Sequence, residues 1–145
     1  MAGFFGKAPI TSDVGLFLEI VVILVLLLSR FDFARKKKFR VHGLTMAGAV
    51  GLHFVTILLV MVPSFARSFS ILVGDFSSPI FVATWIHAPL GLSLLVLSVY
   101  LVSSWRFQKP ADTCFKKAKL MRYVWLLWLL DLLIGLVLYI SIAFY

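Results

Sequence analysis

Residues 123–145 read YVWLLWLLDLLIGLVLYISIAFY, an apolar run with a single charged residue, Asp131. A helix needs about 20 mostly apolar residues to cross the hydrocarbon core of a bilayer. The run lacks the strict alternation of a membrane β-strand. This segment therefore predicts a transmembrane helix, and it sets the class of the whole protein.

Three further apolar runs precede it, so the sequence predicts helices at about 14–29, 43–62, 80–104 and 123–145. The spans must be helical because lipid offers open backbone groups no partners. Hydrophobic residues make up 62% of the 145 residues and charged residues 14%, against about half and a quarter in soluble domains. We expect an all-α fold: one domain, residues 1–145, forming an integral membrane bundle of four antiparallel transmembrane helices in the lipid bilayer.

The basic residues predict the orientation of this bundle. Two loops, after the first and the third helix, carry six lysines and arginines each, whereas the opposite side has only Lys7 and Arg67. Cytoplasmic loops are enriched in these residues, so we expect a cell-membrane protein with cytoplasmic basic loops and both termini outside. Because the net charge of +8 is gathered in short runs between apolar segments, we expect no nucleic-acid partner.

Several shorter segments also carry expectations. Cys114 is the only cysteine, so no internal disulfide is possible, and its loop is expected to lie in the reducing cytoplasm. The first apolar run is expected to remain as a helix, because a basic stretch follows it and no cleavage site does. The second helix is expected to stop at Pro63, and the loop Ser64–Ser78 to lie along the membrane surface.

Helix-packing and interfacial residues are suggested by size and aromaticity. Small residues in the second helix are expected to let it approach its neighbours closely; they are Gly43, Ala47, Gly48 and Gly51. Aromatic residues at the inner interface are expected to form a belt; they are Trp105, Tyr123 and Trp125.

Each predicted helix contains one ionisable residue, in order Glu19, His53, His87 and Asp131. Such residues inside a membrane are costly and point to a site. At about 1.5 Å per residue, the two histidines lie within about one helical turn of each other in depth. If both face inward, they could hold one iron between them, as ligands of a b-type haem. The alternative is that they are hydrogen-bonded packing residues.

The neighbours of the two histidines fit that hypothesis. Ala49 and Gly91 each lie one turn from a histidine and would leave room for a flat macrocycle. Thr56 and Thr84 could fix the ring tautomers. His42 is too far along its helix to share that iron, so it could contact a haem propionate, bind a separate metal or lie at the headgroups. Glu19 could reach the outer surface, and Asp131 could pair with a histidine, pair with a partner protein or carry protons.

The chain contains no hydrolase elbow, phosphate loop or HExxH sequence, and no CxxCH for covalent haem. Independent catalytic activity is therefore not expected from a bundle this small.

The stretch Arg40-Val41-His42-Gly43-Leu44-Thr45-Met46, His87 with Gly91, and the last segment resemble a known family. In the last segment the matching residues are Arg122, Trp128, Gly135 and Tyr139. The family comprises small four-helix membrane proteins of largely uncharacterised function and includes the cytochrome oxidase assembly factor CtaM. The resemblance covers most of the chain after Arg35.

This resemblance implies an accessory or assembly role for haem-copper oxidases. Two departures limit the resemblance. Lys117 stands where the family often has a histidine in the loop before the fourth helix. Near the outer end of the second helix, where the family often has another histidine, this chain reads Met61-Val62-Pro63-Ser64. A metal or haem role implied by the family therefore transfers only to His42 and His87, whereas His53 is particular to this chain.

Three hypotheses follow from the sequence. The leading one is a haem b membrane protein of the respiratory chain, with His53 and His87 as axial ligands, that passes electrons or assists a haem-copper oxidase. The second is a cofactor-free structural or assembly subunit of a larger membrane complex. The third is a copper or iron site made by the two histidines with Glu19 and Asp131.

Overall fold

The computed structural model describes residues 4, 7–34, 36–74, 79–106 and 115–144. Within these ranges the elements are α1 (Ile10–Leu28), η1 (Ser29–Ala34), α2 (Phe39–Thr56), η2 (Ile57–Met61), α3 (Val62–Gly74), α4 (Pro79–Arg106) and α6 (Ala118–Phe144). The two η elements are π-helical turns. Four helices are long and apolar enough to cross a membrane. The predicted all-α membrane bundle is confirmed.

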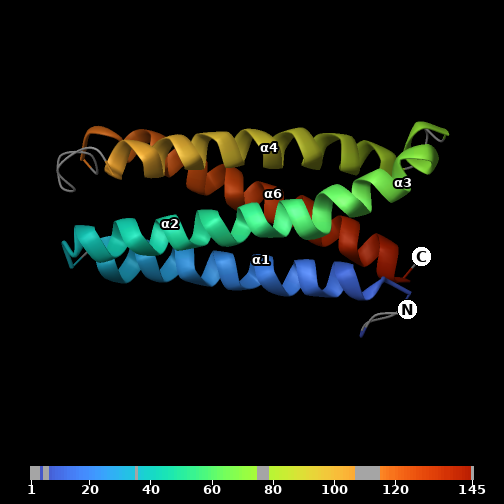
Figure 1. The fold of residues 1–145 in the computed structure, drawn as a ribbon, viewed down its shortest axis with the longest axis horizontal. Helices are drawn as coiled ribbons and strands as arrows, with labels where there is room; N and C mark the ends of the chain where they lie inside the picture. The colour runs from blue at the N-terminus through green and yellow to red at the C-terminus, as the bar shows by residue number, and fades with distance from the viewer. Residues whose placement is uncertain (1–3, 5–6, 35, 75–78, 107–114, 145) are drawn as a thin grey trace.

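The helices run antiparallel, with α1 beside α2 and α4 against α6 (Figure 1). The two termini lie at the same end of the bundle (Figure 1). There the backbone N–H of Lys7 donates a hydrogen bond to the carbonyl of Ala143 at 2.9 Å. The first and last helices are therefore joined at the end opposite the basic loops.

The interior of the bundle is filled by a continuous apolar cluster from all four long helices, formed by Val22, Ile23, Leu26, Ala49, Val50, Leu94, Leu95, Leu101, Val124 and Trp128. Many large apolar side chains point outward instead, among them Phe17, Leu59, Leu92 and Leu133, each at least 60% exposed. A helix that is apolar on all sides has lipid on its outer face. The outward residues are therefore suited to contact acyl chains.

The second helix does not stop at Pro63, as the sequence suggested. It continues through η2 into α3 and reaches Gly74. Proline lacks an N–H, and in a regular α-helix its ring clashes with the carbonyl four residues earlier. In η2 the turn widens, and the N–H of Val62 donates to the carbonyl of Ile57, five residues back. This wider register just before Pro63 lets the helix continue.

The predicted surface loop Ser64–Ser78 is correspondingly helical as far as Gly74. Residues 75–78 lie outside the described residues, as do Cys114 and most of the loop that contains it. The predictions made for that cysteine therefore stay predictions.

The predicted close packing of the second helix is correct at Gly43 and wrong at two other glycines. A Cβ on Gly43 would overlap the indole of Trp105 from α4. A Cβ on Gly48 or Gly51 would meet nothing within 4 Å. In the second half of α2 the buried residues are Ala49, Val50, His53 and Thr56, and the two glycines lie outside this set. The small size of these residues therefore did not indicate which face of α2 packs against the other helices.

Candidate functional site

The centre of the bundle holds two imidazole–carboxylate pairs. The first joins α1 to α2, where Nδ1 of His53 donates a hydrogen bond to Oε1 of Glu19 at 2.8 Å. The histidine is 1% exposed and the glutamate 9%. An ionisable group in a membrane interior needs a partner of this kind. Glu19 thus points into the bundle rather than toward the outer surface.

The second pair joins α4 to α6. Nδ1 of His87 lies 2.9 Å from Oδ1 of Asp131, an ion-pair contact with a buried aspartate. Glycines one turn away make this approach possible. A Cβ on Gly91 would lie 3.3 Å from the Asp131 carboxylate, and one on Gly135 would lie 3.1 Å from the His87 ring. Each ionisable side chain therefore occupies the space above a glycine of the opposite helix.

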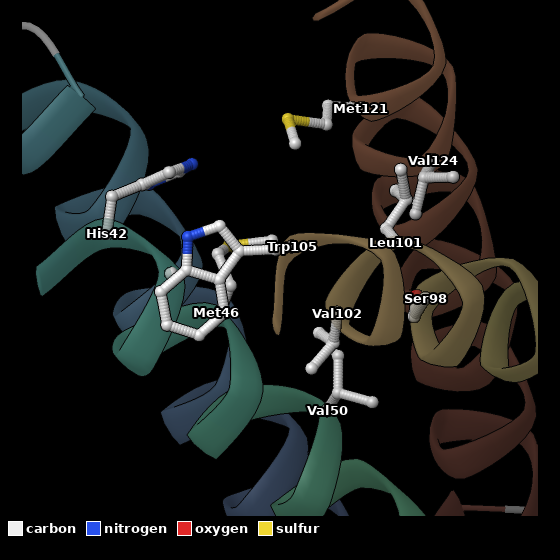
Figure 2. A pocket seen from close by; sticks show the side chains of 10 residues that line it. His42, Met46, Val50, Ser98, Leu101, Val102, Trp105, Met121 and Val124 are labelled. Atoms are coloured by element: carbon white, nitrogen blue, oxygen red, sulfur yellow. The ribbon is translucent and has the colours of Figure 1, made fainter. Parts of the chain in front are cut away.

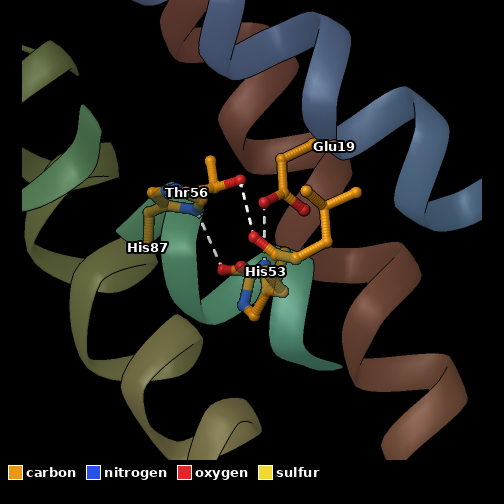
Figure 3. A network of polar contacts seen from close by, with 6 residues as sticks. Glu19, His53, Thr56 and His87 are labelled. Carbon is orange, nitrogen blue, oxygen red and sulfur yellow. Dashed lines mark hydrogen bonds and ion pairs between the residues drawn. The ribbon is translucent and has the colours of Figure 1, made fainter. Parts of the chain in front are cut away.

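The two pairs form one central polar layer (Figure 3). Trp128 lies one turn from Asp131 on α6, and its indole contacts the His53 ring with centroids 5.0 Å apart. The four residues that the sequence assigned to four separate helices are thus assembled at one level.

The layer leaves three buried atoms without a hydrogen-bond partner among the described residues: Nδ1 of His87 and Oδ1 of Asp131, which contact each other as an ion pair, and Nε2 of His53. In His53, Nδ1 is used by Glu19, while Nε2 is buried and has no hydrogen-bond partner among the described residues. Buried polar atoms without a partner are rare and call for an explanation, such as a water or an ion. With the proton on Nδ1, Nε2 carries the free lone pair that a metal needs.

The threonines predicted to fix these rings make no hydrogen bond to them among the described residues. The hydroxyl of Thr56 donates to the carbonyl of Leu52 at 3.0 Å, and that of Thr84 donates to Ile80 at 2.8 Å. A hydroxyl in an apolar helix is most simply satisfied by its own backbone four residues earlier. The carboxylates of the central layer contact the rings instead.

The space predicted beside the histidines is filled in this structure. Ala49 is 2% exposed and belongs to the apolar core, and Gly91 is covered by Asp131. Gly135 and Trp128 were not assigned to the site from sequence. The signal for Gly135 was present, since Asp131 and Gly135 repeat in α6 the four-residue spacing of His87 and Gly91 in α4.

His42 belongs to a separate cluster at the basic end of the bundle. Its Nδ1 donates to the carbonyl of Ser29 at 3.1 Å and lies 2.7 Å from the same residue's hydroxyl. Ser29 in turn lies 2.8 Å from the hydroxyl of Thr45. Figure 2 shows the ring extending from α2 toward a cavity of about 40 Å³ that Trp105 and Met121 also line. The prediction that His42 lies apart from the central histidines agrees with this placement.

A third polar contact lies near the termini and was not predicted. The hydroxyl of Tyr139 on α6 donates to Oδ1 of Asp13 on α1 at 2.6 Å, and the backbone N–H of Phe4 donates to the other oxygen. Nothing in the spacing of Asp13 distinguished it from a residue flanking the membrane. Within the described ranges, no three His, Cys, Asp or Glu side chains are arranged to hold a metal ion.

No protein-family model, curated protein or solved structure matches this chain. The resemblance to the four-helix assembly family therefore stays a prediction from sequence.

Proposed function

We propose that this protein handles a transition metal within the membrane, with Nε2 of His53 and Nε2 of His87 as the metal-binding atoms. The observation that carries the proposal is the buried, unpartnered Nε2 of His53, whose Nδ1 is held by Glu19. Metal-binding histidines characteristically donate their other ring nitrogen to a carboxylate, which fixes the tautomer and raises the basicity of the ligand. In the second pair, Nδ1 of His87 lies 2.9 Å from Oδ1 of Asp131, which is an ion-pair contact without the geometry of a hydrogen bond.

The central residues suit a bare copper or iron ion better than a haem. Imidazole is a good ligand for copper and iron, either of which could supply one-electron chemistry when bound. The two positions expected to make room for a macrocycle, Ala49 and Gly91, are occupied by core packing and by Asp131. We therefore propose a bare metal ion ahead of haem b as the bound group. An absorption spectrum of the purified protein distinguishes the two.

A second candidate is a cofactor-free structural or assembly subunit. The observation in its favour is the close fit of His87 over Gly135 and of Asp131 over Gly91. That fit would give both side chains a packing role even without a metal. The implied accessory role at a haem-copper oxidase is compatible with either candidate and rests on the resemblance alone.

The test is metal analysis of the purified protein. We would express the chain with ample haem, copper and iron, purify it in mild detergent, and record metal content and the oxidised and reduced absorption spectra. The proposal predicts bound copper or iron without a Soret band. His53→Leu and His87→Leu should lose the metal, and Glu19→Gln should weaken binding by about 10–100-fold.

The matched control is His42→Leu, which removes an imidazole outside the central layer and should leave the metal content unchanged. A Soret band lost in the central variants would favour haem. Folded protein that contains neither metal nor haem would contradict the proposal and favour the cofactor-free subunit.

We further propose that the basic loops face the cytoplasm, supported by the uneven distribution of lysine and arginine. Cys114 allows a test, because it is the only thiol in the chain. In intact cells a membrane-impermeant maleimide should leave it unlabelled, and permeabilised cells should show labelling. Labelling in intact cells would show that the basic loops face the outside, which contradicts the proposed orientation.

A further inference from the structure

A cavity of about 320 Å³ opens at the basic end of the bundle. It lies between the end of α1 with η1, the beginning of α2, and the first turns of α6. Arg30 of η1, which is partly exposed, and Arg122 of α6, which is exposed, lie at its rim. None of the side chains lining it is acidic, among the described residues. The cavity therefore carries positive charge without an internal counterion.

The two arginines differ in how they are held. The guanidinium of Arg30 lies over the Trp125 ring, 4.4 Å from its centroid. Stacking of this kind orients the planar group and leaves its edge N–H groups free for an anion. Arg122 lies one turn before Trp125, is exposed, and has no ion-pair or hydrogen-bond partner among the described residues. One stacked and one unpaired guanidinium thus line a cavity that has no acidic side chain among its described lining residues.

The remaining wall is apolar. Leu26, Met46 and Met121 line the inner part of the cavity, on the side of the apolar core. The His42 ring forms a further part of the wall and is fixed there by Ser29. A ligand that fits this arrangement has a negative headgroup at the rim and a hydrocarbon portion beneath it.

We propose that this cavity binds the phosphate headgroup of an anionic phospholipid. Basic pockets between transmembrane helices at the membrane interface match such headgroups in charge and in position. Arginine recognises phosphate through two parallel hydrogen bonds. The apolar wall favours a lipid over free phosphate, because a soluble anion would leave that wall uncovered. The site shares no residue with the proposed metal centre and does not depend on it.

The test measures thermal stability in detergent during titration with short-chain phosphatidylglycerol, short-chain phosphatidylcholine or inorganic phosphate. We expect phosphatidylglycerol to raise the melting temperature with saturation, and the other two to have little effect. Arg122→Gln should weaken the response to phosphatidylglycerol by about tenfold, because it removes a charge-assisted contact. Arg30→Lys, which keeps the charge and loses the planar stack, should weaken it as well.

Arg67→Gln is the control, because Arg67 lies at the other end of the bundle and bonds its own helix at Pro63. That variant should respond like the wild type. An equal response to phosphatidylcholine would show that headgroup charge is not recognised, and an equal response to inorganic phosphate would identify a soluble anion as the ligand. Either result, or an unchanged response in both Arg30→Lys and Arg122→Gln, would overturn the proposal.

Discussion

The ring of His87 on α4 lies directly against Gly135 on α6, with its Cε1 atom 3.1 Å from where a Cβ of that residue would be. The relationship is reciprocal, since Asp131 on α6 covers Gly91 on α4 in the same manner. Helices in membranes associate through close packing and polar contacts between them rather than through the hydrophobic effect. The packing of His87 against Gly135 and of Asp131 against Gly91 therefore forms a specific contact between α4 and α6, called here the α4–α6 junction.

Gly135→Ala should destabilise the protein by about 1–3 kcal/mol, because the added methyl group overpacks the contact with His87. The measurement is the free energy of unfolding in mixed micelles during titration with a denaturing detergent. Gly51→Ala is the matched control, since its methyl group meets nothing within 4 Å. It should be neutral or stabilising by up to about 1 kcal/mol, through helix propensity. Equal effects of the two substitutions would show that the junction is not tightly packed.

Gly43→Ala should cost at least about 2 kcal/mol, because its methyl group would overlap the Trp105 indole. Because the cost arises from the Trp105 indole, a smaller side chain at that position should remove it. In a Trp105→Leu background the same glycine substitution should cost less than about 0.5 kcal/mol, because the two changes are coupled through one contact. If Gly43→Ala cost the same with Trp105 or with leucine at that position, its effect would not come from a clash with the indole.

Much of the fold could be predicted from the sequence, because the bilayer imposes it. Apolar length alone located the four spans, and antiparallel order followed from the short connections. The end of the second helix was misjudged, because Pro63 stops a regular helix and the π turn η2 before it depends on local geometry. The packed face of α2 was also ambiguous, because lipid and core are both apolar and leave no polar stripe to mark the outside.

Glu19→Leu should destabilise the protein by about 1–3 kcal/mol, because it leaves Nδ1 of His53 buried without its acceptor. His53→Leu should also destabilise it, since the carboxylate then loses its partner. The double variant should cost less than the sum of the two single costs, by about 0.5–3 kcal/mol of coupling. Strict additivity in this cycle would contradict a direct interaction.

Tyr139→Phe should lower the free energy of unfolding by about 1 kcal/mol, because it removes the 2.6 Å hydrogen bond to Asp13. Tyr123→Phe serves as its control, since Tyr123 is exposed and makes no hydrogen bond among the described residues. The control should change stability by no more than about 0.5 kcal/mol. A comparable loss in both variants would point to a general effect of the hydroxyl group.

The candidate site was only partly visible in the sequence. One ionisable residue per span identified Glu19, His53, His87 and Asp131 as a group, because lipid makes such residues conspicuous. Which residue faces which depends on helix rotation, which spacing does not fix. Threonines were expected to fix the rings, whereas carboxylates on neighbouring helices contact them; the contact of Asp131 with a histidine was among the alternatives, and that of Glu19 was not. The packing of the Asp131 carboxylate against Gly91 also depends on that rotation.

The pairing of opposite groups also bears on how the chain enters the membrane during synthesis. Glu19 finds His53 within the N-terminal hairpin, and His87 finds Asp131 within the C-terminal one. Each half thus contains both members of its own imidazole–carboxylate pair, so these polar side chains can contact each other in lipid before the other half has been translated. We therefore expect the two hairpins to insert one after the other, and the hydrogen bond from Tyr139 to Asp13 then joins the last span to the first.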